Sequence, residues 1–114
     1  MASRNVYNCS HFLEVLIDSK TTKKQRLCLL GTANTSQVEC ILEIVFNCIS
    51  GNVDLPVNVT RFLVRYKTIF SAVSNLRSSY RKRLRGIRDN IFVIDSFFVK
   101  IRPVIRLLLT EGSK

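Results

Sequence analysis

The stretch SQVECILEIVFNCISGN, residues 36–52, has the clearest helix signals in this sequence. Its apolar residues recur at steps of three and four, which is the period of one face of an α-helix. Those residues are Val38, Ile41, Leu42, Val45 and Ile49. Ser36 and Glu39 have the spacing of a capping box at a helix N-terminus, and Gly51 is a natural helix stop. We therefore expect a helix here, followed by a loop from Gly51 to Pro56.

Helical periodicity continues on both sides of this stretch. Upstream, Ser10 can cap a first helix, and Thr21 or Thr22 can start a short second helix that ends at Gly31. Downstream, apolar residues at helical spacing predict three further helical segments, over about 58–76, 77–88 and 91–109. The last segment is expected to bend near Pro103, because proline lacks the backbone N–H that a helix interior needs.

Composition agrees with a folded helical chain. Only four Gly and two Pro residues interrupt the 114 residues, and 46% of the residues are hydrophobic, which is enough for a buried core. The length corresponds to one domain. We expect an all-α fold, a compact single-domain bundle of five or six helices that spans residues 1–114.

The positive charge lies in one half of the chain. Residues 1–57 contain five basic and five acidic residues, whereas residues 58–114 contain thirteen basic and three acidic residues, so the second half carries the whole net charge of +10. Such an asymmetry is typical of a protein that meets a polyanion, with nucleic acid first and an anionic membrane second. The alternative is a solvated basic face that only keeps the protein soluble.

The candidate nucleic-acid-binding residues come from this basic half. Guanidinium groups match phosphate oxygens as planar forks, and they stay charged under all cellular conditions. The candidates are Arg61, Arg65, Arg77, Arg81, Lys82, Arg83, Arg85 and Arg88. No zinc finger, homeodomain-like helix or RNP motif is present to read bases. We therefore expect binding that is independent of sequence, with double-stranded DNA favoured over RNA and all eight residues on one continuous surface.

The sequence predicts no enzyme, no metal site and no cofactor. His11 is the only histidine, and no G-x-S-x-G, P-loop or H-E-x-x-H motif occurs. The four cysteines, Cys9, Cys28, Cys40 and Cys48, form no C-x-x-C pair. The last three lie in apolar runs and are expected to be small core residues with reduced thiols, which indicates an intracellular protein.

The apolar segment 91–109 leaves two alternative functions open. Asp95, Arg102 and Arg106 fall on one stripe of a helical wheel, which predicts an amphipathic helix that packs on the core. One alternative is that the segment is the interface of a helical protein–protein or capsid-associated module, which contacts itself or a capsid protein. The other, which is not favoured, is that the segment and the basic run together contact anionic membranes.

Short matches in the middle of the chain resemble one family. They are Lys23-Lys24-Gln25-Arg26, Leu29-Leu30-Gly31-Thr32-Ala33, Gln37-Val38 to Glu43, Asn47-Cys48-Ile49-Ser50-Gly51-Asn52-Val53, Leu55-Pro56 and Arg65-Tyr66-Lys67-Thr68. Over residues 12–92 the chain is similar to small basic late or core-type proteins of Maverick/Polinton elements and adintovirus-like double-stranded DNA viruses. The resemblance implies a virion core protein that condenses a viral genome, located in the host nucleus or the virion. The family usually has a Gly-Gly-Phe turn after its basic tract, which this chain lacks.

Overall fold

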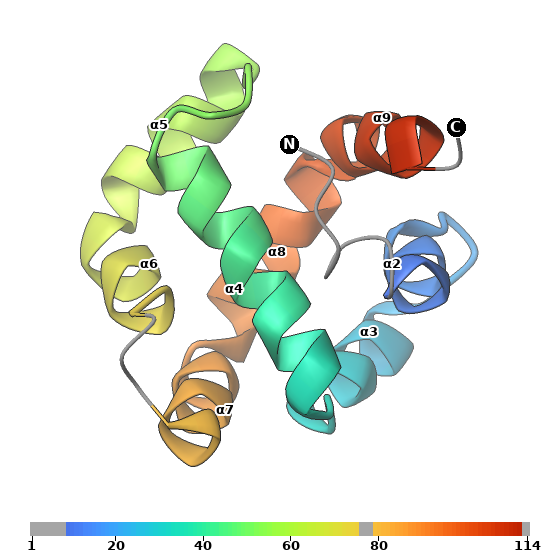
Figure 1. Cartoon of the computed structure of the whole chain (residues 1–114), viewed down its shortest axis with the longest axis vertical. Coiled ribbons are helices and arrows are strands. Elements are labelled where there is room, and N and C mark those ends of the chain that lie inside the picture. The colour runs from blue at the N-terminus through green and yellow to red at the C-terminus, as the bar shows by residue number, and fades with distance from the viewer. Residues whose placement is uncertain (1–8, 76–78, 113–114) are drawn as a thin grey trace.

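A computed structural model describes residues 9–75 and 79–112 of the chain, with side chains through Thr110. These residues form eight α-helices and no strand (Figure 1). The helices are α2 (Ser10–Ile17), α3 (Lys23–Gly31), α4 (Thr35–Ile49), α5 (Val57–Arg65), α6 (Lys67–Val73), α7 (Tyr80–Asp89), α8 (Ile91–Lys100) and α9 (Arg102–Gly112). The prediction of an all-α globule is confirmed, whereas the predicted number of five or six helices is wrong.

Two of the expected helices divide, which accounts for the higher number. The expected helix over 58–76 changes direction at Tyr66 (φ −110°, ψ 28°) and becomes α5 and α6. Backbone bonds still bracket this bend, since Tyr66 N–H donates to Phe62 O and Phe70 N–H donates to Tyr66 O. The expected helix over 91–109 divides at Ile101, and Pro103 stands in the first turn of α9, where no backbone N–H is needed.

The core lies around α4 and α8. Figure 1 shows α4 crossing the molecule, with α8 behind it and the other helices around the two. On α4, Cys40, Ile41, Leu42 and Val45 are fully buried, and α8 with the start of α9 buries Ile94, Phe97, Phe98, Ile101 and Ile105. The rings of Phe70 and Phe97 lie 5.0 Å apart between α6 and α8. The expected packing of 91–109 on the core is therefore confirmed.

The N-terminal caps differ in part from the expected ones. Thr22 and Gln25 form a capping box at α3, which confirms the expected start at Thr22. At α4 the capping box consists of Asn34 and Gln37, so the predicted Ser36–Glu39 pair is wrong. Asn34 and Gln37 are three residues apart, as Ser36 and Glu39 are, and each accepts a backbone bond through its side-chain oxygen, but they stand two residues earlier. The cap predicted at Ser10 is also wrong, because α2 has Cys9 at its N-cap without a side-chain bond.

A buried ion pair joins the two halves of the chain. Arg26 of α3 binds Asp95 of α8 through Nε–Oδ1 at 2.7 Å and Nη2–Oδ2 at 3.3 Å. Its Nη1 donates to the carbonyl oxygen of Thr21 at 3.0 Å. The expectation that Asp95 shares a polar stripe with Arg102 and Arg106 is therefore wrong for Asp95. A carboxylate in the apolar core is tolerated here because a guanidinium group matches both of its oxygens.

Among the described helices, none is long and apolar enough to cross a membrane.

Candidate nucleic-acid interface

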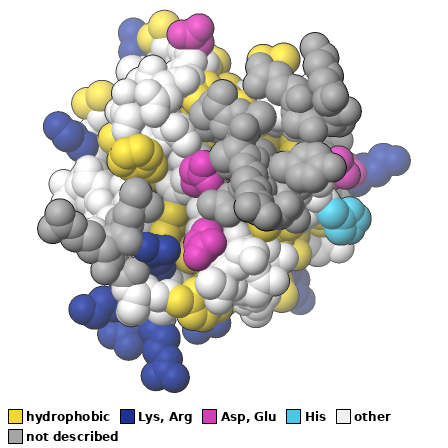
Figure 2. Space-filling view, in the orientation of Figure 1, with side chains coloured by type: hydrophobic (Ala, Val, Ile, Leu, Met, Phe, Trp, Pro, Cys, Tyr) yellow, Lys and Arg dark blue, Asp and Glu magenta, His cyan; other side chains and the backbone are white. Residues whose placement is uncertain are grey.

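Helix α7 carries five of the eight predicted residues. These are Arg81, Lys82, Arg83, Arg85 and Arg88. The helix begins after Ser79, whose Oγ accepts a bond from the backbone N–H of Lys82 at 3.4 Å. Figure 2 shows the largest gathering of dark blue side chains at the lower left of the molecule, over α7, with others scattered around the outline. Of the remaining predicted residues, Arg77 lies outside the part of the chain that the structure describes.

The basic residues of α7 do not all share one face. Arg81, Arg85 and Arg88 follow one another at steps of four and three, so their exposed side chains form one stripe along the helix. Lys82 is exposed beside this stripe. We call these four residues, Arg81, Lys82, Arg85 and Arg88, the α7 group. Arg83 lies on another side of the helix, and its Nε atom is buried, so it stands outside this group.

Apolar contacts and two hydrogen bonds hold α7 in place. Ile87 is fully buried and Leu84 is half-buried on the inner side of the helix. The hydroxyl of Tyr80 donates to the carbonyl oxygen of Ala33 at 2.7 Å, and Nε of Arg88 donates to the carbonyl oxygen of Gly31 at 2.6 Å. Gly31 is the last residue of α3, and Ala33 lies in the connection between α3 and α4. The exposed stripe is thus presented by a helix that is tied down near both ends.

Electrostatics makes the α7 group receptive to an anion. Like charges three and four residues apart on a helix repel each other. The first turn of α7 also contains no acidic residue, so Arg81 and Lys82 face the positive end of the helix dipole. Within the described part of the chain, no carboxylate forms an ion pair with any of the four residues. A bound phosphate would relieve both kinds of repulsion.

Arg61 and Arg65 lie elsewhere on the molecule. Both are exposed on α5, and Figure 1 shows α5 and α7 at opposite ends of the long axis. The expectation of one continuous basic surface is therefore wrong. The physical reason is the bend at Tyr66: α6 leads the chain away from α5 before α7 begins.

A lysine that the sequence did not indicate joins Arg61 and Arg65. Lys100 Nζ at the end of α8 lies 5.4 Å from the centre of the Phe62 ring, and the Arg65 guanidinium lies 5.4 Å from the centre of the Tyr66 ring. The two rings are 4.8 Å apart. We call Arg61, Arg65 and Lys100 the α5–α8 group. No local pattern could have found Lys100, because its neighbours belong to a distant helix.

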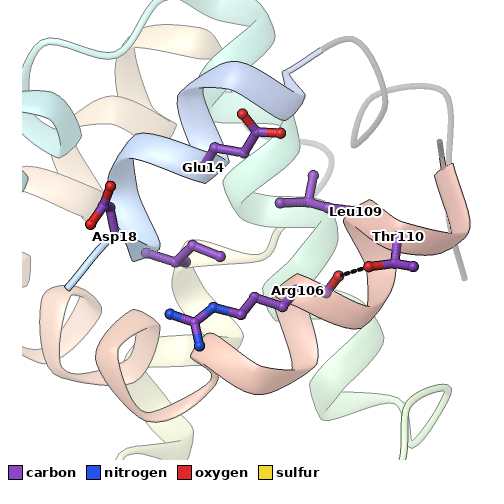
Figure 3. A pocket seen from close by; sticks show the side chains of 6 residues that line it. Glu14, Asp18, Arg106, Leu109 and Thr110 are labelled. Carbon is purple, nitrogen blue, oxygen red and sulfur yellow. Dashed lines mark hydrogen bonds between the residues drawn. The ribbon is translucent and has the colours of Figure 1, made fainter.

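The surface between α2 and α9 is mixed in sign. An open hollow of about 500 Å³ is lined there by Glu14, Ile17, Asp18, Arg106, Leu109 and Thr110. Figure 3 shows Arg106 reaching from α9 toward α2, which carries Glu14 and is followed directly by Asp18. Because the acidic side chains repel phosphate, Arg106 does not extend either basic group.

The described cysteines and carboxylates do not gather into a group that could hold a metal ion. No cluster of three or more His, Cys, Asp or Glu residues occurs in the described part of the chain.

Cys40 and Cys48 are buried, and burial raises the pKa of both thiols, to about 11 for Cys48. Their predicted place in the core is confirmed. Cys28 is exposed, so the same prediction is wrong for it.

No family model, curated protein or solved structure matches this chain. The resemblance to the Maverick/Polinton and adintovirus proteins therefore stays a prediction.

Proposed function

We propose that this protein binds nucleic acid without regard to sequence, with double-stranded DNA as the favoured partner, through the α7 group. The observation that carries the proposal is the stripe of Arg81, Arg85 and Arg88, with Lys82 beside it, which no carboxylate neutralises among the described residues. A basic face that only solubilises the protein does not require Arg81 and Arg85 in register on a helix that Tyr80 and Arg88 hold near its two ends.

The spacing of the stripe suits a phosphate backbone. Steps of four and three residues advance about 6 and about 4.5 Å along a helix axis. Phosphates of one DNA strand succeed each other about every 3.4 Å along the duplex axis. Neighbouring guanidinium groups are therefore spaced to contact successive or alternate phosphates of one strand. Each can bind its phosphate by two parallel bonds.

The same arrangement argues against base reading. The Tyr80 hydroxyl is used in the bond to Ala33, and Arg88 Nε is used in the bond to Gly31. Helix α7 carries no Asn or Gln that would pair with adenine, so a base contact would have to come from the same arginines and lysine that are proposed to bind phosphates. Contacts of this kind position a protein on a duplex and do not specify a sequence.

A salt titration tests the proposal. Four phosphate contacts predict that the logarithm of the affinity falls with the logarithm of the salt concentration with a slope of about −3.6. Two duplexes of unrelated sequence should give the same slope and comparable affinity, with single-stranded DNA and RNA measured beside them. A flat salt response, or a strong preference for one duplex sequence, would overturn the proposal.

The alternatives that use 91–109 have less support. Most apolar residues of that segment lie in the core, and only Phe92 and Leu107 among its large apolar side chains are strongly exposed. An interface or a membrane contact would need a continuous apolar face instead. The further step to a viral genome, in the host nucleus or a virion, is a proposal that only the resemblance supports.

A further inference from the structure

The exposed residues predicted to bind nucleic acid, with Lys100 added, lie in two groups instead of the expected one. The α7 group lies at one end of the long axis, and α5, which supplies two residues of the α5–α8 group, lies at the other end (Figure 1). The Cα atoms extend 34 Å along that axis. Helices α6 and α8 each pack against both α5 and α7 and lie between them. The two groups therefore belong to different parts of the surface.

The α5–α8 group is built on aromatic rings that the core holds. Phe62 lies 6.0 Å from Phe70, which in turn lies 5.0 Å from the buried ring of Phe97. Arg65 and Lys100 stand over the rings of Tyr66 and Phe62. A cation held against a ring face keeps its charge at a defined place, although its side chain is exposed.

This second group is also open to a polyanion. Arg61, Arg65 and Lys100 are all exposed, and no carboxylate forms an ion pair with them among the side chains of residues 9–75 and 79–110. Arg61 and Arg65 are one helical turn apart and repel each other, as the arginines of α7 do. The two groups thus present the same chemistry, a set of exposed cations without an ion-paired carboxylate among the described side chains.

We infer that one molecule binds two separate duplexes, one on each group, and so bridges them. This inference rests on the proposed binding at α7. The 34 Å length corresponds to about ten base pairs of duplex. DNA is stiff over about 150 base pairs, so a duplex bound at α7 does not bend around so small a body to reach the far end. The α5–α8 group remains available to a second duplex.

The rival geometry is a single duplex that lies along the side of the molecule and touches both groups. It has less support. Lys100 lies over the Phe62 ring, so the α5–α8 group lies at the C-terminal end of α8, and Lys67 is the only basic residue of α6, the helix between α5 and α7. The two geometries differ in a measurable way. In the rival geometry both groups contribute to the affinity for one duplex, whereas in bridging the second group contributes little to it.

A two-duplex capture experiment tests the inference with the full chain. A short biotinylated duplex is fixed on beads, and a fluorescent duplex of unrelated sequence is captured through the protein at low salt. The variant Arg61→Gln/Arg65→Gln/Lys100→Gln removes the second group, and Arg81→Gln/Lys82→Gln/Arg85→Gln removes most of the first. A control of equal charge, Lys20→Gln/Lys24→Gln/Arg106→Gln, removes three exposed cations that belong to neither group.

Wild type and the charge control should capture the fluorescent duplex. The α5–α8 variant should bind one duplex within about threefold of wild type but capture at least about tenfold less of the second. Unchanged capture by that variant, which self-association of the protein would produce, overturns the inference. A loss of affinity for one duplex as large as the loss of capture overturns it too, because it would indicate the rival geometry. The proposed function itself fails separately, if wild type and the α7 variant bind one duplex equally weakly. Unchanged urea midpoints would show that each variant is folded.

Discussion

Arg26 and Asp95 meet in the core through two parallel bonds, 69 positions apart in the sequence, with Nε–Oδ1 at 2.7 Å. Their side chains are 12% and 4% exposed. The pair clamps α3 to α8 and joins the neutral half of the chain to the basic half. It also removes one of the three acidic residues of the second half from the surface, so the exposed balance there is more positive than the sequence count suggests.

Breaking this pair should destabilise the protein strongly. Asp95→Asn leaves the Arg26 guanidinium buried without a counter-charge, which costs about 3–5 kcal/mol in comparable sites. The measurement is the free energy of unfolding from urea titration. Asp89→Asn is the control, because Asp89 is exposed and should change that energy by less than about 0.5 kcal/mol. Equal effects of the two substitutions would contradict the clamp.

The capping box of α4 makes a second prediction. Asn34 Oδ1 accepts from Gln37 N–H at 2.9 Å, and Gln37 Oε1 accepts from Asn34 N–H at 3.0 Å. Asn34→Ala should therefore lower the free energy of unfolding by about 1 kcal/mol. Ser36→Ala, at the position that the sequence first indicates, should change it little. If Ser36→Ala lowered the free energy of unfolding more than Asn34→Ala did, Ser36 would be the cap instead of Asn34.

Tyr80 should matter for stability and not for nucleic-acid binding. Tyr80→Phe removes the bond to Ala33 O, which should cost about 0.5–1.5 kcal/mol of unfolding free energy. Affinity for duplex DNA should stay within about twofold, since the contacts proposed there are made by cations. A large loss of affinity without a loss of stability would indicate that the ring stacks on a base.

Arg85 and Arg83 form a matched pair on α7. Arg85→Gln should reduce the salt slope of DNA binding by about one, because one phosphate contact is lost. It should also stabilise the free protein by about 0.2–0.5 kcal/mol, since repulsion from Arg81 and Arg88 falls. Arg83→Gln should leave the slope unchanged, because Arg83 lies outside the stripe. Equal slopes for the two variants would argue against the stripe.

The buried thiols predict a loss of stability at alkaline pH. Burial raises the pKa of Cys48 from 9.0 to about 11 and raises that of Cys40 as well. The unfolded chain therefore loses these protons at lower pH than the folded protein. Their stabilising effect is complete below pH 9 and is lost as the pH rises toward the folded pKa. The urea midpoint should therefore decrease as the pH rises from 9 to about 11.

The control for this effect is the double variant Cys40→Ala/Cys48→Ala. Its midpoint starts lower, because two core side chains are truncated, but it should depend less on pH over the same interval. A pH dependence equal to that of wild type would assign the effect to other groups. In the folded wild type, a thiol reagent should modify the exposed Cys28 well before Cys40 and Cys48.

Much of the fold could be predicted because its signals are local. The apolar periodicity of α4 and the stop at Gly51, whose φ is +75°, follow from residues a few positions apart. The bend at Tyr66 could not be predicted, because no proline or glycine causes it. The shift of the cap to Asn34 was also hidden, since Asn34–Gln37 and Ser36–Glu39 have equal spacing and only one pair can occupy the helix start.

The sequence by itself determined that the chain is helical, that it buries a core and that its charge excess belongs to the second half, because periodicity and composition need no knowledge of distant contacts. Only the tertiary structure decided where each charge points. It pairs Asp95 with Arg26, turns Arg83 away from Arg85, and separates Arg65 from α7 while placing it near Lys100. The physical reason is that the direction of a side chain depends on which helices pack together, and that packing joins residues far apart in the chain.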